Sequence, residues 1–121
     1  MEQWRPDLLI VVGDVNSTLA GALTANKMGI RIAHLESGLR SEDRKMPEEI
    51  NRILTDELSS LLFCPSDVAV EQLRREGIFT DSRPGVRVEV SGDLMLDTAR
   101  HFGGSPAQSA VPTQRVLLTL H

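Results

Sequence analysis

The chain has 121 residues, of which 40% are hydrophobic, and its formal net charge is −4 at pH 7. This length suits one small domain or part of a larger one. The well-mixed charges exclude a general nucleic-acid binder, which needs a basic face. No apolar stretch approaches the roughly 20 residues that span a bilayer. The single cysteine, Cys64, cannot form an intrachain disulfide and lies in an apolar run, which predicts a buried free thiol. We therefore expect a cytoplasmic protein without a nucleic-acid or membrane partner.

The first half of the chain alternates between strand and helix patterns. Residues 8–12 are a continuous aliphatic run that predicts a buried parallel strand. A helix is predicted over residues 16–28, because a glycine follows them, and a second strand over residues 31–35. A second helix is predicted over residues 47–59, because a proline suits its first position and acids suit its first turn. Its expected apolar stripe consists of Ile50, Ile53, Leu54 and Leu58.

The second half continues this alternation. The next predicted elements are strand 61–64, helix 66–76, strand 86–90 and helix 93–101. The segment 103–114 is rich in Gly, Ser and Pro, which is typical of a linker, and residues 115–121 predict a fifth strand. Alternating strands and helices imply right-handed βαβ units. The predicted fold class is therefore α/β, with a parallel sheet flanked by helices on both faces.

Acidic residues follow the predicted ends of two strands, where ligands of open α/β sheets bind. Asp14 follows the first strand and Glu36 follows the second. Because neighbouring strands lie about 4.8 Å apart, both carboxylates can face one cleft. Two such carboxylates can serve as acid and base if their pKa values separate. For Asp14, a capping role at the start of the following helix is an equally good interpretation.

Glu36 also opens a long charged loop, "ESGLRSEDRKMPEE", and loops of this kind above a rigid sheet often carry function. Arg40 can bind phosphate or carboxylate groups, although a solvated charge is the commoner outcome. Glu48 suits a helix start, and Arg52 lies one turn later. A surface ion pair between Glu48 and Arg52 is therefore an alternative to a role in a functional site. His34 is more typical of a core or rim histidine than of a ligand. The sequence contains no metal-binding cluster, GxGxxG motif or Walker A loop.

Four motifs stand in a specific order along the chain: "GDVNST", "HLESGLRS", "MPEEINR" and "LLTLH". In this combination the chain resembles the non-hydrolysing UDP-N-acetylglucosamine 2-epimerases over nearly its whole length, apart from the linker. That resemblance implies a GT-B fold, in which two Rossmann-like domains enclose the active site. It assigns residues 1–102 to the second half of the N-terminal domain and 103–114 to the linker. Residues 115–121 would begin a truncated C-terminal domain.

The same resemblance implies the reaction. Such enzymes interconvert UDP-N-acetylglucosamine and UDP-N-acetylmannosamine by eliminating UDP and adding it back, with no redox or metal cofactor. The site residues that it implies are catalytic Asp14, Glu36, Glu48 and His121 and substrate-binding Arg40 and Arg52. The complete enzyme is expected to be a homodimer. The 121 residues alone are expected to be inactive, because the substrate would bridge two domains.

Two alternatives stay open at this stage. One is a hydrolysing relative, which releases N-acetylmannosamine and UDP. The other is a non-catalytic module that binds a nucleotide sugar. The "NST" and "MPEEINR" motifs favour the non-hydrolysing branch, and the retained acids argue against the non-catalytic module.

Overall fold

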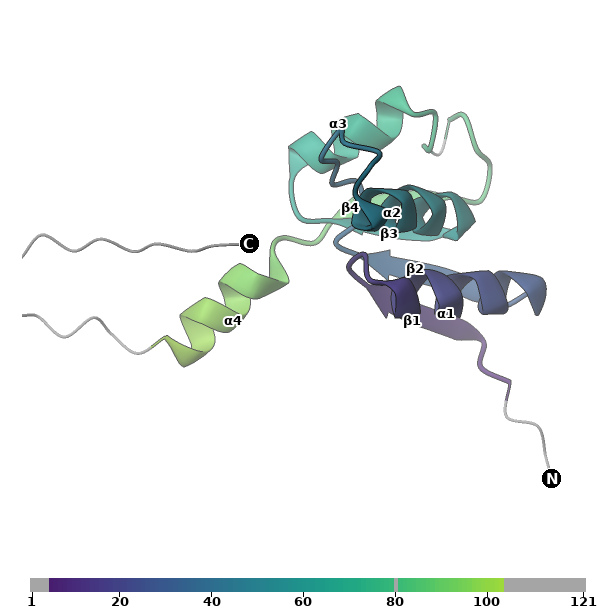
Figure 1. Ribbon diagram of the computed structural model, residues 1–121, viewed down its shortest axis with the longest axis horizontal. Coiled ribbons are helices and arrows are strands. Elements are labelled where there is room, and N and C mark those ends of the chain that lie inside the picture. Colours follow the sequence, from purple (N-terminus) through teal and green to yellow (C-terminus); the bar gives the residue numbers. More distant parts are fainter. Residues whose placement is uncertain (1–4, 80, 104–121) are drawn as a thin grey trace, which may run out of the picture.

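The computed structural model describes residues 5–79 and 81–103 (Figure 1). The elements are, in order, β1 (Leu8–Val12), α1 (Asn16–Lys27), β2 (Arg31–Leu35), α2 (Pro47–Leu58), β3 (Leu61–Cys64), α3 (Asp67–Arg75), β4 (Arg87–Val90) and α4 (Leu94–Phe102). Each element predicted within the described ranges is present, and its ends differ from the prediction by at most one residue. The predicted burial of the first strand is wrong, because Leu8, Ile10 and Val12 are 38%, 58% and 50% exposed. The predicted fifth strand, and the predicted linker apart from Gly103, lie outside the described residues. None of these helices is long and apolar enough to cross a membrane.

The four strands form a parallel sheet in the order β1-β2-β3-β4. Each strand lies beside the next one in sequence. Right-handed crossovers therefore place all the connecting helices on the same face of the sheet. The register agrees, since Val11 lies opposite His34 and His34 lies opposite Leu62, so these side chains share one face. Both α1 and α2 pack side by side on that face, and α3 packs on its continuation over β3 and β4 (Figure 1). The expectation of helices on both faces is therefore wrong for the described part of the chain.

Two apolar clusters attach the helices to the sheet. The first joins α1 to β1 and β2 through Val11, Ala22, Ala25, Ile30 and Ile32. The second joins α3 to β3 and the start of β4 through Leu62, Cys64, Ala69, Leu73, Ile78 and Val86. The burial of Cys64 confirms the predicted buried thiol. By contrast, no residue of α4 is buried, and this helix lies away from the sheet in Figure 1.

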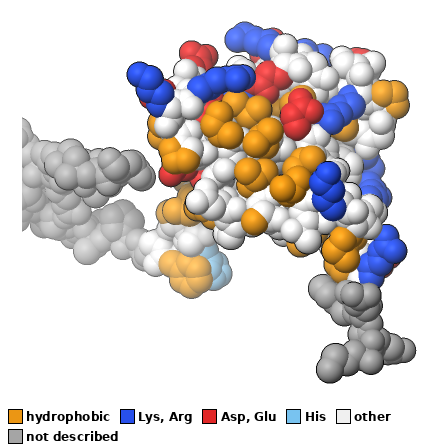
Figure 2. Space-filling model, turned by 45° about the vertical axis from the view of Figure 1, so that its right-hand side comes forward, with side chains coloured by type: hydrophobic (Ala, Val, Ile, Leu, Met, Phe, Trp, Pro, Cys, Tyr) orange, Lys and Arg blue, Asp and Glu red, His pale blue; other side chains and the backbone are white. Residues whose placement is uncertain are grey.

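The orientation of α2 differs from the prediction. Its buried side chains are polar, namely Glu49, Asn51, Thr55 and Asp56. Ile50 and Leu54 are instead 37% and 44% exposed, and Leu58 is the residue of the predicted stripe that packs against an apolar cluster. Figure 2 shows hydrophobic side chains on the surface among charged groups. The physical reason is the buried histidine of β2, His34, which needs polar partners that α2 supplies.

Gly38, in the loop after β2, lies against the first turns of α3. Its φ is 77°, and a Cβ at this position would lie 2.5 Å from the carbonyl oxygen of Ala69. Gly77, which follows α3, has nearly the same φ of 75°, but a Cβ there would meet nothing within 4 Å. The two glycines therefore share a backbone conformation and differ in their surroundings.

We predict that Gly38→Ala lowers the free energy of unfolding clearly more than Gly77→Ala does. Gly77→Ala measures only the cost of placing a residue with a Cβ in the left-handed backbone conformation, which is roughly 1–2 kcal/mol. Gly38→Ala adds an overlap with the main chain of α3, which cannot move aside like a flexible side chain. Urea denaturation of the two variants measures the difference. Equal losses would contradict the close contact between the loop and α3.

Candidate active site

The ends of β1 and β2 lead into two adjacent turns that carry acids. The amide of Gly13 donates to the carbonyl of Leu35 at 3.1 Å, which joins the two turns. Glu36 Oε2 lies 3.7 Å from the point that a Cβ on Gly13 would occupy. Glu36 also has a φ of 68°, a left-handed conformation that residues with a Cβ rarely adopt and that is concentrated at functional sites. The two turns thus lie together, as the parallel register predicts.

Asp14 is held by α2 rather than by α1. Arg52 donates from Nη2 to Asp14 Oδ2, and Asn51 donates to the main-chain oxygen of Asp14 at 2.9 Å. The same Asn51 amide donates to Asn16 Oδ1, also at 2.9 Å. The N-cap of α1 is Val15, which makes no side-chain capping bond, so the capping interpretation of Asp14 is wrong. The Asp14 side chain is 28% exposed, which leaves it accessible to a ligand.

Arg52 connects Asp14 to a second carboxylate. Its Nη1 donates to Glu49 Oε2 at 2.9 Å, while Nη2 is directed at Asp14. The alternative of a surface pair between Glu48 and Arg52 is therefore wrong, because the partner within α2 is Glu49 at i−3. The Arg52 side chain is 15% exposed. This cation sits between a nearly buried carboxylate and an accessible one.

Glu49 orders the loop that follows β2. Its carboxylate accepts hydrogen bonds from the Ser41 amide at 2.8 Å, the Ser41 hydroxyl at 3.0 Å and the Glu42 amide at 3.2 Å. Burial acts to raise the pKa of Glu49, but these bonds and the charge of Arg52 outweigh it and hold the pKa below its ordinary value. Glu49 is thus an ionised anchor for the loop rather than a simple helix-start residue.

Asp56 lies two turns further along α2, completely buried, and joins three groups. Its Oδ1 lies 2.6 Å from His34 Nδ1, and its Oδ2 accepts from the Gly38 amide at 3.1 Å and pairs with Arg40 Nη1 at 2.8 Å. Arg40 also donates to both oxygens of Glu76, at 2.8 and 2.6 Å. Burial acts to lower the pKa of Arg40, but Glu76 and Asp56 outweigh it and raise that pKa. For Glu76, burial acts to raise the pKa, but the hydrogen bond and charge of Arg40 outweigh it and hold that pKa below its ordinary value.

The predicted site residues fall into three groups. Those at the carboxyl end of the sheet are Asp14, Glu36 and Arg52. Glu48 is exposed at the start of α2, one helical turn before Arg52. Arg40 faces carboxylates of its own chain, and its side chain is 5% exposed. His121 lies outside the described residues. The catalytic and substrate-binding roles of all of these residues stay predictions.

Three supporting residues of α2 escaped the sequence analysis: Glu49, Asn51 and Asp56. For Glu49 and Asp56 the available signal was spacing, since residues 49, 52 and 56 recur at helical intervals and share one polar face. That signal is weak, because α2 has a regular apolar face as well, and spacing alone does not indicate which face is buried.

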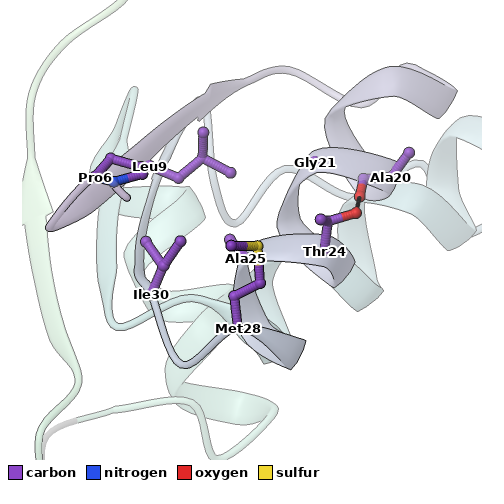
Figure 3. A pocket seen from close by; sticks show the side chains of 8 residues that line it. All are labelled: Pro6, Leu9, Ala20, Gly21, Thr24, Ala25, Met28 and Ile30. Carbon is purple, nitrogen blue, oxygen red and sulfur yellow. Dashed lines mark hydrogen bonds between the residues drawn. The ribbon is translucent and has the colours of Figure 1, made fainter. Parts of the chain in front are cut away.

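An apolar cavity of about 480 Å³ lies away from these acids, between β1, the segment before it and α1 (Figure 3). It is lined by Pro6, Leu9, Ala20, Gly21, Thr24, Ala25, Met28 and Ile30. None of these side chains is titratable, so the cavity has no part in acid–base chemistry.

A family model described as UDP-N-acetylglucosamine 2-epimerase matches residues 1–121. The chain belongs to the UDP-N-acetylglucosamine 2-epimerase family. The predicted resemblance is thereby confirmed at the level of this family. The solved structures of this family have the GT-B fold, which confirms the predicted Rossmann-like α/β class as part of that fold.

Individual relatives agree with this assignment. A UDP-2,3-diacetamido-2,3-dideoxy-D-glucuronate 2-epimerase of Pseudomonas aeruginosa is 48% identical over 97% of this chain and 33% of its own. The UDP-N-acetylglucosamine 2-epimerase of Methanocaldococcus jannaschii is 60% identical over 77% of this chain and 24% of its own. A crystal structure of the latter enzyme with UDP-GlcNAc and UDP superimposes with a TM-score of 0.72 at 49% identity, covering 79% of this chain and 25% of the enzyme. This member of the epimerase family thus spans a quarter to a third of the length of these relatives.

We predict that the fold loses stability as the pH falls below 4.5, the ordinary value for the Glu49 and Glu76 carboxyls. Because folding lowers both pKa values, the unfolded chain binds protons more readily than the folded one. The stabilisation is therefore present above pH 4.5 and is lost as the pH falls through the lower folded values. Glu49→Gln removes the contribution of one of these carboxylates, so its loss of stability against the unsubstituted chain should be larger at pH 7 than near about pH 3.

Urea denaturation at the two pH values measures this deficit. The matched control is Glu48→Gln, the exposed neighbouring carboxylate, which should change stability by about 0.5 kcal/mol or less. A deficit for Glu49→Gln that does not shrink in acid would contradict the assignment of Glu49 as an ionised anchor.

Proposed function

We propose that the complete protein inverts C2 of a UDP-sugar, interconverting UDP-N-acetylglucosamine and UDP-N-acetylmannosamine without net hydrolysis. The observation that carries this proposal is the pair of acids, Asp14 and Glu36, on adjoining turns at the carboxyl end of the sheet. Family membership supports it. So does a crystal structure of the Neisseria meningitidis UDP-GlcNAc 2-epimerase bound to UDP-GlcNAc, with a TM-score of 0.65 at 34% identity, covering 81% of this chain and 28% of that chain.

The chemistry explains why carboxylates are needed. A base removes the C2 proton while the bond from C1 to the UDP oxygen breaks, giving 2-acetamidoglucal and UDP. An acid then delivers a proton to the opposite face of C2, and UDP oxygen bonds to C1 again. Asp14, Glu36 and Glu48 supply carboxyl groups for these proton transfers, which typically contribute 10²–10⁴-fold to a rate. Arg52 would hold Asp14 and present positive charge to the substrate.

Several features of the complete protein belong to this proposal. Residues 1–102 form the second half of the N-terminal domain, and the substrate binds between two domains, with His121 near the nucleotide phosphates. Turnover then requires the part of the enzyme that this chain, a quarter to a third of its relatives, does not include. The complete protein acts in the cytoplasm as a homodimer.

A second substrate is favoured by one comparison. The relative from Pseudomonas aeruginosa, whose match covers 97% of this chain, is named for a diacetamido-dideoxy-glucuronate. That reaction is also a 2-epimerisation, so the same acids would serve it. Parallel assays with both UDP-sugars decide between the two substrates, and release of a free sugar would indicate the hydrolysing outcome.

We predict that Asp14→Asn, Glu36→Gln and Glu48→Gln each lower kcat of the complete enzyme by about 10²-fold or more, because each removes a proton-transfer group. The amides preserve shape, so the folded state should persist. Glu71→Gln is the matched control, because Glu71 is an exposed carboxylate of α3 that pairs with Arg74 and Arg75. Steady-state assays with UDP-N-acetylglucosamine measure the effect. Turnover near that of the control in any one variant would remove that residue from the proposed site.

A further inference from the structure

His34 links the acid-bearing turn after β1 to the buried charges of α2. It is completely buried, and each nitrogen of its ring has one partner. Nε2 lies 2.8 Å from the main-chain oxygen of Gly13, and Nδ1 lies 2.6 Å from Asp56 Oδ1. A carbonyl oxygen can only accept, so Nε2 carries a hydrogen. The imidazole therefore donates to the peptide group that joins Gly13 to Asp14.

The partner behind the imidazole is itself fully engaged. Asp56 Oδ2 accepts from the Gly38 amide and pairs with Arg40, and Arg40 pairs with Glu76. His34, Asp56, Arg40 and Glu76 thus form one connected chain of contacts. Every buried side-chain nitrogen and oxygen among the described residues has a hydrogen-bond partner. A fully paired buried network of this kind has a rigid geometry, so it can hold the ring of His34 in one orientation.

We propose that His34 is a positioning residue for Asp14, an inference that rests on the proposed function. The hydrogen bond from its Nε2 fixes the Gly13–Asp14 peptide and thereby the direction in which the Asp14 side chain leaves the backbone. Arg52 holds the carboxylate itself, so the acid is fixed at both ends. Misplacing a reacting group by about 1 Å can lower a rate by about 10²-fold.

Two substitutions separate the two contacts of the ring. In His34→Gln the amide nitrogen takes roughly the place of Nε2, so a donor to Gly13 is kept and the contact with Asp56 is lost. In His34→Asn the amide takes roughly the place of Nδ1, so the contact with Asp56 is kept and the donor to Gly13 is lost. In the complete enzyme we expect His34→Asn to lower kcat by about 10- to 100-fold with KM little changed. We expect His34→Gln to stay within about threefold of the unsubstituted enzyme, because the peptide before Asp14 is still held.

The unfolding midpoint of each variant is measured beside its kinetics, because a purely structural role of His34 would lower stability without this difference in kcat. If neither variant folds, Asp56→Asn decides. Its amide oxygen must accept from Gly38 and Arg40, so its NH₂ group faces Nδ1 and the neutral ring still donates from Nε2 to Gly13. This variant should be less stable, since Arg40 loses a charged partner, but should keep kcat within about threefold.

The outcomes distinguish this inference from the proposed function. An unsubstituted complete enzyme that does not epimerise a UDP-sugar overturns the proposed function and the role of His34 that rests on it. With an active enzyme, a lower kcat for folded His34→Asn than for folded His34→Gln supports the positioning role. Equal kcat values for those two folded variants overturn it, and so does loss of kcat in folded Asp56→Asn.

Discussion

The contact between the polar face of α2 and the ends of β1 and β2 determines the rest of this structure. Asp56 binds the buried ring of His34, while Asn51 and Arg52 bind the turn that carries Asp14. Buried charges are tolerated when they are paired, and breaking such a pair is strongly destabilising. The helix therefore cannot turn these residues outward, and Ile50 stays at the surface as a consequence. The fixed conformation of the acid-bearing turns and the exposure of the apolar face of α2 therefore both follow from these polar contacts of α2.

Burial divides the carboxylates of this site into two kinds. Glu49 and Asp56 are almost completely buried and bind main-chain amides and guanidinium groups, so they anchor the loop and the ring of His34. Asp14 retains contact with solvent, and Glu48 is exposed. Proton transfer to a ligand requires a carboxylate that the ligand can reach, whereas orientation requires one that it cannot. The fold supplies both kinds from α2 and the turn beside it.

Local patterns were sufficient to predict the elements and the parallel α/β class, but not which face of the sheet is covered or which face of α2 is buried. Aliphatic runs, the proline at the start of α2 and the glycines after α1 and α3 place the helix and strand ends within one residue. The face that α2 buries depends on partners distant in sequence, since His34 and Asp56 are 22 residues apart and Asp14 and Arg52 are 38 apart. The single covered face of the sheet likewise follows from the strand order, which no local pattern contains. The position of Asp14 directly after a strand was enough to make it a candidate site residue. Its contacts with Asn51 and Arg52 of α2 could be found only from the structure.

We propose that the reacting sugar binds above the turns that carry Asp14 and Glu36, and a crystal structure of the complete protein with UDP-N-acetylglucosamine tests this most directly. The quantity to measure is the distance from each carboxylate to C2 of the sugar and its proton. We expect C2 to lie between the two acids, with a carboxylate oxygen within about 3–3.5 Å of it, as a reacting pair requires. A sugar bound elsewhere, with both acids beyond the reach of C2, would contradict the account.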